Sequence, residues 1–169
     1  DVTDEPILQH PTDDDYYLTH NEFDRESIWG AYFVPSEWNV SNVDDMYRVT
    51  VIFGHSNGNS MHKKFSVLKY FRDVNFAKEH RYIYLTLGEQ QTRWKIFAVA
   101  DYPIDPSYTI ANPDDSYFLT EIASMKAYSY NQYATEVGLN DKVLILSTCS
   151  GSDNYDTRFI VCAKLDEVF

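Results

Sequence analysis

Apolar and polar residues alternate along six segments of the chain, as they do in β-strands that bury one face. Several of these segments are also rich in β-branched and aromatic residues, which favour strands. The segments are GAYFV (30–34), MYRVTVIFGH (46–55), RYIYLTLG (81–88), TRWKIFAVADYPI (92–104), KVLILSTC (142–149) and TRFIVCAKLDEV (157–168). The pattern predicts a mainly β fold, with GEQQ (88–91) as a hairpin loop between two strands.

Helical spacing is found in two segments, 63–80 and 114–130. The first has apolar residues every three positions and a break near Asp73, which predicts two short helices. The second opens with aspartates suited to capping and has one apolar face, formed by Phe118, Ile122 and Met125. Because strands outnumber helices and the helices lie between strands, we expect a closed or nearly closed β-barrel with peripheral helices.

The chain has 169 residues, without an internal repeat or a Gly/Ser-rich or Pro-rich linker, so we expect one domain over 1–169. Its first part, 1–29, is polar and aromatic. We expect it to be a loop segment with a short helix or turn near Tyr16–His20, packed on the barrel.

Composition excludes several classes of function. Hydrophobic residues make up 44% and charged residues 24%, values that argue against disorder. The net charge of −12 argues against a nucleic-acid partner.

No CxxC or HExxH motif is present, and we interpret Asp13–Asp15 and Asp114–Asp115 as solvated acids, so we expect no metal and no cofactor. No run of 18 apolar residues occurs, and the chain starts at Asp1, so we expect that any signal or anchor segment has been removed.

Two cysteines lie in the last two strand segments, which we expect to pair around the turn SGSDNYDT. A symmetric turn places Cys149 directly opposite Arg158, on the same face, and Cys162 opposite Ile145. The two cysteines are then about 13 Å apart along the strand. A disulfide requires Cα atoms within about 7 Å, so we expect both thiols to be free.

Cys149 is the candidate nucleophile, because polar residues on both sides place it at an exposed strand end. A guanidinium opposite it stabilises a thiolate, and also an oxyanion formed after attack. Cys162 lies within FIVCA and is interpreted as a small core residue. Of five histidines, His55 alone ends an apolar strand and enters a Gly/Asn-rich loop, so it is the candidate proton-transfer partner of Cys149.

The order His, Cys, Arg, with LSTC closing one strand and TRF opening the next, resembles the sortases, whose motif reads T-L-x-T-C. Three further features resemble class B: YYLTHNEF followed by GAYF, the stretch GHSNGNSMHKKFSVLKYF, and a helix at 114–130 before the Cys strand. The resemblance covers nearly the whole chain. It departs at Ser56, where the family commonly has Asn, and at Ser150, where an acidic or polar residue often follows the Cys.

The resemblance implies a closed barrel of about eight strands, with a long helix in the loop before the Cys strand. It also implies a cysteine transpeptidase in which Cys149 forms a thioester with the threonine of a C-terminal sorting signal, His55 moves protons, and Arg158 holds substrate and oxyanion. By position in the family, the substrate-binding candidates are Leu18, Tyr108, Thr109 and Ser147.

The partners that the resemblance implies are the sorting-signal peptide of a surface protein and an acceptor amine, from a peptidoglycan cross-bridge or a pilin lysine. We expect Asn-Pro-x-Thr or Ser/Pro-Pro-x-Thr signals to be preferred over Leu-Pro-x-Thr. The implied location is the outer face of the membrane of a Gram-positive bacterium, held by an N-terminal anchor that this chain lacks. The exact motif, the acceptor, and the choice between anchoring and pilus assembly stay open.

Two other functions are compatible with a free thiol on such a chain. A papain-like hydrolase has its Cys early, at a helix N-terminus and before the His, whereas here the His precedes a Cys that ends a strand. A non-catalytic β-barrel binding module would carry the thiol incidentally. Alkylation separates such a module from an enzyme, because a reactive Cys149 beside an unreactive Cys162 indicates an enzyme.

Overall fold

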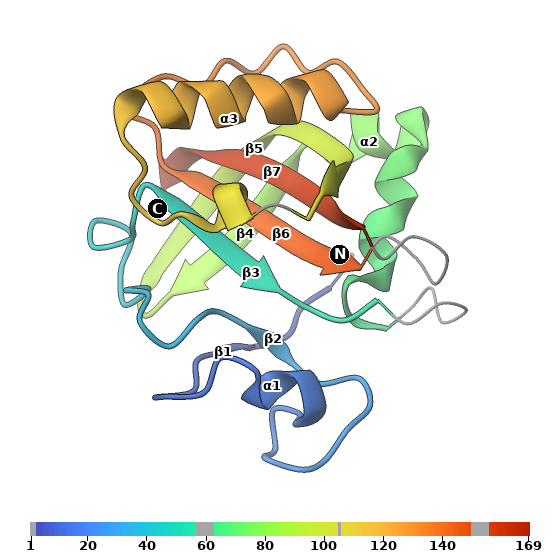
Figure 1. The fold of residues 1–169 in the computed structure, drawn as a ribbon, viewed down its shortest axis with the longest axis vertical. Coiled ribbons are helices and arrows are strands. Elements are labelled where there is room, and N and C mark those ends of the chain that lie inside the picture. Colours follow the sequence, from blue (N-terminus) through green and yellow to red (C-terminus); the bar gives the residue numbers. More distant parts are fainter. Residues whose placement is uncertain (1–2, 57–62, 105, 150–155) are drawn as a thin grey trace.

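In a computed structural model, which describes residues 3–56, 63–104, 106–149 and 156–169, a single seven-stranded sheet forms the centre of the protein (Figure 1). Neighbouring strands follow the order β1-β2-β3-β6-β7-β5-β4. The strands are β1 Ile7–Leu8, β2 Tyr32–Phe33, β3 Val49–Phe53, β4 Tyr82–Leu87, β5 Gln90–Pro103, β6 Val143–Cys149 and β7 Thr157–Val168. The predicted mainly β class is therefore confirmed.

The hairpin of β6 and β7 has the predicted register. Cys149 pairs with Arg158, and Ile145 pairs with Cys162. Cys162 is fully buried and free, so it forms no disulfide with Cys149. The predicted turn at 150–155 and the side chain of Cys149 lie outside the described residues.

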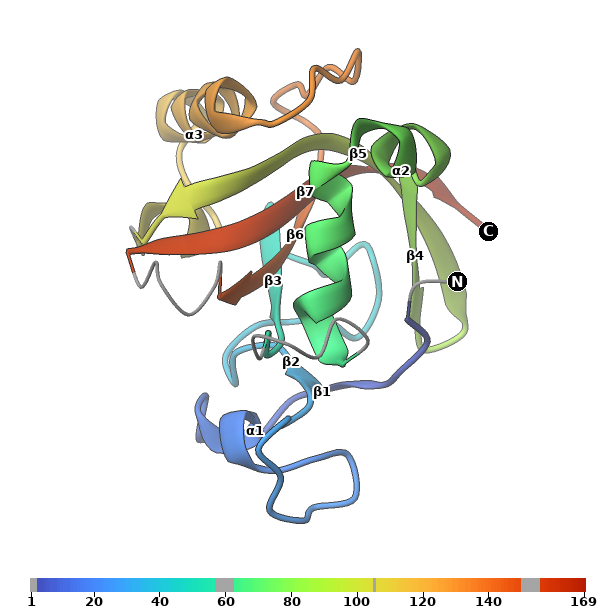
Figure 2. The same cartoon turned by 90° about the vertical axis from the view of Figure 1, so that its right-hand side faces the viewer.

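The predicted closure into about eight strands is not found in the described residues. They form seven strands, and β1 and β4 are the two edges of the sheet. The sheet curls into a half-barrel instead (Figure 2). Among the described residues β1 pairs with β2 over two residues, and no pairing of β1 with β4 is found.

The hairpin loop between β4 and β5 is shorter than predicted. Leu87 pairs with Gln90, so the turn consists of Gly88 and Glu89, while Gln90 and Gln91 already belong to β5. Gly88 has a φ of +58°, a conformation that glycine adopts without a steric penalty.

Helices lie at the predicted places, and one further short helix, η2, was not predicted. They are α1 Tyr16–Thr19, the 3-10 helices η1 Lys64–Arg72 and η2 Pro106–Thr109, α2 Val74–Glu79, and α3 Asp115–Tyr128 in the connection before β6. The break between η1 and α2 is at Asp73, whose carboxylate accepts hydrogen bonds from the N–H groups of Asn75 and Phe76. Asp114 caps α3 in the same way. In the part of the chain that the structure describes, no helix is both long and apolar enough to cross a membrane.

Both faces of the sheet are buried. On the concave face, Phe159 and Val161 of β7 pack with Phe65 of η1. On the other face, Ile160 and Cys162 pack under α3, which lies across the sheet (Figure 1). This alternation decides which side chains near the strand ends share a face.

Candidate active site

The three predicted catalytic residues lie at one end of the sheet. β3 and β6 are parallel, with Phe53 beside Ser147, so the chain leaves both strands at the same end. His55 follows β3 by two residues and Cys149 is the last residue of β6. The antiparallel β7 begins there, which places Arg158 next to Cys149.

His55 is oriented by a backbone carbonyl of the N-terminal segment. Its Nε2 lies 2.7 Å from the carbonyl oxygen of Leu18, at the end of α1. A carbonyl only accepts hydrogen bonds, so Nε2 carries the proton and donates it. In the neutral imidazole, Nδ1 is then the nitrogen that is able to take up a proton.

Gly30 allows the N-terminal segment to approach His55 this closely. A Cβ at this position would lie 2.1 Å from the carbonyl oxygen of Tyr17 and 3.1 Å from Cδ2 of His55. Its φ of +54° also favours glycine. Gly30 was not among the residues predicted from the sequence, although GAYF is one of the segments that resemble class B.

Gly54 also allows a close approach, in this case of two aromatic side chains. A Cβ there would lie 2.7 Å from the rings of both Phe65 and Tyr32. Its N–H donates to the carbonyl oxygen of Ser147 at 3.2 Å, which extends the pairing of β3 with β6 up to the residue before His55. The position of His55 is therefore determined by two neighbouring segments, α1 and β6.

Arg158 is half-buried, and its Nη1 donates a weak hydrogen bond to the carbonyl oxygen of Thr157 at 3.4 Å. Arg158 and His55 both line a cavity of about 450 Å³. A guanidinium has five N–H donors, and among the described residues the bond to Thr157 is the only one found for that of Arg158.

Three of the four predicted substrate-binding residues line the same cavity: Leu18, Thr109 and Ser147. Tyr108 does not. It is buried, and its hydroxyl lies 3.1 Å from the Ser147 hydroxyl, so it supports a wall residue from behind.

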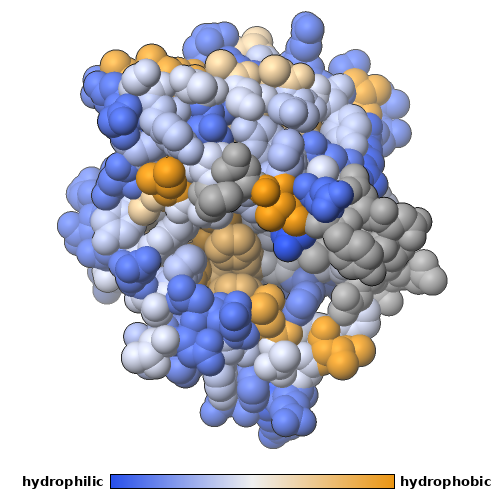
Figure 3. Space-filling model, viewed as in Figure 1, coloured by the Kyte–Doolittle hydropathy of each residue, from blue (hydrophilic) through white to orange (hydrophobic). Residues whose placement is uncertain are grey.

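Neither the aromatic floor of the cavity nor its acidic rim was predicted from the sequence. Phe33, Phe53 and Trp38 line the floor, and the rings of Phe33 and Phe53 stack with centroids 5.6 Å apart. Asp14, Asp15 and Glu37 also line the cavity. Figure 3 shows a hollow with an apolar floor on this face of the molecule. The sequence pattern that could have indicated this floor is the alternation of side-chain direction along β2 and β3. It places Phe33 and Phe53 on the same face of the sheet.

Burial raises the pKa of the Cys162 thiol far above its ordinary value. This thiol is therefore protonated at neutral pH and is not a nucleophile. Among the described residues, no group of three or more His, Cys, Asp or Glu side chains is arranged to hold a metal ion.

The relatives found by comparison with known proteins are sortases B. No family model matches the chain. In sequence it is 27% identical, over 164 residues, to sortase B of Listeria monocytogenes, an alignment that covers 96% of this chain and 64% of that protein. The chain thus spans just under two thirds of the length of this relative.

Solved structures agree in fold. The structure of sortase B from Listeria monocytogenes superimposes with a TM-score of 0.80 at 26% identity, over 95% of this chain and 86% of the other. Sortase B complexed with triglycine superimposes with a TM-score of 0.83 at 21% identity, over 96% of this chain and 74% of the other. The half-barrel is therefore a fold of the sortase type. In sequence and in fold, the chain resembles class B sortases over nearly its whole length, as its motifs indicated.

Proposed function

We propose that this protein is a sortase-type cysteine transpeptidase with Cys149, His55 and Arg158 as its catalytic residues. The observation that carries the proposal is their convergence at one end of the sheet. Arg158 is paired with Cys149, and it lines the same cavity as His55. The likeness to sortase B in sequence supports the same activity.

In the first half of the reaction, the Cys149 thiolate attacks the carbonyl carbon of a threonine in the sorting signal. The C–N bond to the next residue breaks, and the departing amine takes a proton from His55. A thioester between Cys149 and the threonine remains. Arg158 donates to the oxyanion of the tetrahedral intermediate, where a preorganised donor is worth most.

In the second half, an acceptor amine attacks the thioester carbon. His55 takes the proton of the attacking amine, the C–S bond breaks, and the Cys149 thiolate is restored as a new amide forms. Because Nε2 of His55 donates to Leu18, Nδ1 is the nitrogen that gives and takes this proton.

The cavity fits an extended peptide with apolar parts. Leu18, Thr109 and Ser147 contact its backbone and side chains, and Tyr108 holds Ser147 in place. The aromatic floor suits the ring of a proline. From the resemblance to class B, we expect Asn-Pro-x-Thr or Ser/Pro-Pro-x-Thr signals to be preferred.

The acceptor amine comes from a peptidoglycan cross-bridge or a pilin lysine. A structure of sortase B is described as complexed with triglycine, a short peptide with a free amine. From the resemblance to class B, we also propose that the protein acts at the outer face of a Gram-positive cell membrane, held there by an N-terminal anchor segment.

A panel of fluorogenic sorting peptides, with and without triglycine, tests the proposal. We expect cleavage of threonine-containing signals, a ligated product with triglycine, and a thioester visible by mass spectrometry. A clear preference for Leu-Pro-x-Thr would contradict the expected specificity alone. Cleavage by a Cys149→Ala variant would contradict the transpeptidase itself, and cleavage of no member of the panel would favour a non-catalytic binding module.

A further inference from the structure

Helix α3 is linked to the walls of the active-site cavity through one carboxylate, that of Glu121. This residue is half-buried, and its Oε2 accepts hydrogen bonds from the Tyr102 hydroxyl at 3.1 Å and from the Ser107 hydroxyl at 3.2 Å. Tyr102 belongs to β5 and Ser107 to η2. A single oxygen atom therefore joins three elements of the fold, and the proposed mechanism makes no use of it.

η2 supplies part of the cavity wall. Its last residue, Thr109, lines the cavity, and Tyr108 contacts the hydroxyl of Ser147, which lines it too. A helix of four residues does not form on its own, because nucleation costs more than its few hydrogen bonds return. The position of η2 is thus decided by its tertiary contacts, which include the bond from Ser107 to Glu121.

The second donor, Tyr102, connects the same carboxylate with the start of β7. In the ladder of β5 with β7, Tyr102 is the direct partner of Arg158. Its ring meets the ring of Tyr108 edge-on, with centroids 6.0 Å apart. Burial is the main cause that raises the pKa of Tyr102 to about 12, so its hydroxyl keeps the proton at neutral pH and remains a donor. Through Tyr102 and Ser107, Glu121 is linked to both sides of the candidate active site.

Loss of the Glu121 carboxylate would affect η2 more than β5. Tyr102 has a second partner on α3, the Ser124 hydroxyl at 2.7 Å, and this contact would remain. Tyr108 belongs to the same apolar cluster as Phe118 of α3, which keeps η2 near the helix. The expected result is a displaced η2 in a protein that is still folded.

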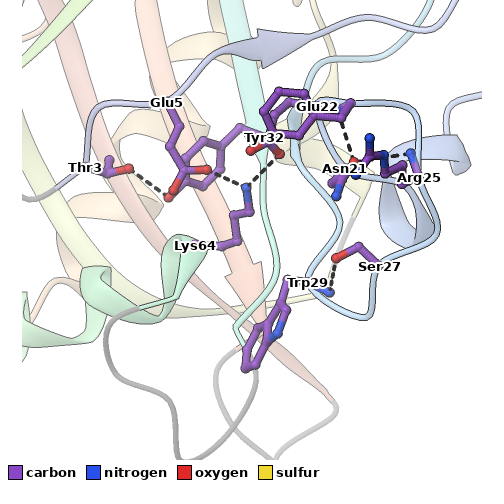
Figure 4. A network of polar contacts seen from close by, with 10 residues as sticks. Thr3, Glu5, Asn21, Glu22, Arg25, Ser27, Trp29, Tyr32 and Lys64 are labelled. Carbon is purple, nitrogen blue, oxygen red and sulfur yellow. Dashed lines mark hydrogen bonds and ion pairs between the residues drawn. The ribbon is translucent and has the colours of Figure 1, made fainter.

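The α1 side of the cavity is held by a different set of contacts. Lys64 forms ion pairs with Glu5 and, at 3.5 Å, with Glu22, which follows α1 (Figure 4). The carbonyl group that orients His55 belongs to α1. These contacts involve neither α3 nor η2, so a change at Glu121 is expected to move the wall at η2 without moving His55.

We propose that Glu121 is a positioning residue: by holding η2 through Ser107, it sets the distance between Thr109 and α1 across the cavity, and thereby the affinity for the sorting-signal peptide. The inference rests on the proposed function, because it concerns the same cavity and the same substrate. Glu121 acts through η2 and not on the reacting atoms. Its effect therefore belongs to KM rather than to kcat.

Peptide cleavage by three variants tests this role. Glu121→Ala is expected to raise KM for a fluorogenic Asn-Pro-Ala-Thr peptide at least about fivefold, with kcat within about twofold of wild type. Glu121→Gln is expected to keep the wild-type KM, because its amide oxygen has two lone pairs and accepts both bonds. Glu136→Ala is the control, since Glu136 is 90% exposed and pairs with Lys126 of α3. An unchanged KM in Glu121→Ala would overturn the proposal.

Ser107→Ala removes the donor on η2 and provides a second route to the same change. This variant is expected to raise KM as Glu121→Ala does. The double variant is expected to be no worse than Ser107→Ala alone, because both substitutions remove the same hydrogen bond. Additive effects would show that the two residues act separately, and the proposal would be wrong.

Hydrogen exchange tests the position of η2 without relying on catalysis. The N–H of Ile110 donates to the Ser107 carbonyl oxygen at 3.3 Å, so its exchange follows the stability of η2. We expect this amide to exchange at least about tenfold faster in Glu121→Ala, and at the wild-type rate in Glu121→Gln. The buried Val161 is the reference, because a general loss of stability accelerates both amides. Exchange of Ile110 at the wild-type rate, or only in parallel with Val161, overturns the proposal.

The role of Glu121 and the transpeptidase activity fail in different ways. If the wild type cleaves the peptide and Glu121→Ala has the same KM, the transpeptidase stands and the role of Glu121 is wrong. If the wild type binds a dye-labelled Asn-Pro-Ala-Thr peptide without cleaving it, the transpeptidase is wrong, and the anisotropy of the same peptide with Glu121→Ala decides the role of Glu121. If the wild type neither binds nor cleaves the peptide, both are wrong.

Discussion

Cys149 and Cys162 lie on paired strands but are expected to differ in reactivity. Cys162 is fully buried, and burial raises the pKa of its thiol. Alkylation with iodoacetamide under native conditions is therefore expected to modify Cys149 alone, with Cys162 reacting only after unfolding. Peptide mapping by mass spectrometry measures this directly, and native labelling of Cys162 would contradict the described packing.

Arg158 differs from a simple positive charge because its planar guanidinium donates two parallel hydrogen bonds. Arg158→Lys keeps the charge and loses this geometry. Loss of one oxyanion donor costs about 10²–10³ in rate in well-studied enzymes, so we expect a fall of that order in peptide cleavage. Arg93→Lys is the matched control, since Arg93 pairs with Asp166 and does not line the cavity. If Arg158→Lys cleaves at the wild-type rate, Arg158 is only a structural neighbour.

His55 transfers protons in both halves of the proposed reaction. His55→Ala is expected to lower peptide cleavage by at least about 10²–10⁴, the usual contribution of general acid–base catalysis. His80→Ala is the control, because His80 stacks on Phe76 and does not line the cavity. A single-turnover assay shows whether thioester formation is lost as well. Normal turnover in His55→Ala would exclude His55 as the proton carrier.

At the scale of elements, the contact between α1 and the residues after β3 decides the orientation of His55. Gly30 permits this contact, and a Cβ there would lie 2.1 Å from the Tyr17 carbonyl oxygen. Gly30→Ala is thus expected to displace the end of α1, to lower kcat, and to destabilise the fold by more than about 1 kcal/mol. Gly138→Ala is the control, because the nearest atom to its added Cβ lies at 3.8 Å.

Unfolding curves and peptide cleavage, measured on both glycine variants, test the contact of α1 with His55. Loss of stability in Gly30→Ala with kcat unchanged would show that the position of Leu18 does not influence His55. Equal effects of the two substitutions would show that the close approach at Gly30 is not the cause.

For the whole molecule, alkaline pH is expected to reduce stability. Burial is the main cause that raises the pKa of Tyr102 to about 12, and its hydroxyl also contacts Ser124 and Glu121. In the unfolded chain a tyrosine has a pKa of about 10. Below pH 10 both states are protonated and this stability is fully present, while between pH 10 and 12 the unfolded state loses the proton first and stability falls.

Urea unfolding at a series of pH values measures the slope. Tyr102→Phe is expected to flatten the slope between pH 10 and 12. Cys162 contributes in the same direction from about pH 9, because its pKa is also raised by burial. An unchanged slope in Tyr102→Phe would show that Tyr102 ionises alike in both states.

The sequence by itself determined the local part of this protein. The register of β6 with β7 agrees with that predicted from the polar segment between the two strands and the two-residue period of a strand, so the pairing of Cys149 with Arg158 was predictable. The cap at Asp73 and the apolar face of α3 are local in the same sense. The resemblance to sortases added the proposed catalytic roles of these residues, because the residues of that motif have known roles in the family.

Only the tertiary structure decided the features that depend on contacts between distant segments. The parallel pairing of β3 with β6 brings His55 to the Cys149 strand, and Tyr108 is buried behind Ser147 instead of lining the cavity. Over the part of the chain that the structure describes, the sheet is open between β1 and β4, although strand segments alone suggested a closed barrel. Such pairings depend on which edges meet in space and on the close approach allowed at Gly30, and no local pattern of apolar and polar residues encodes either of them.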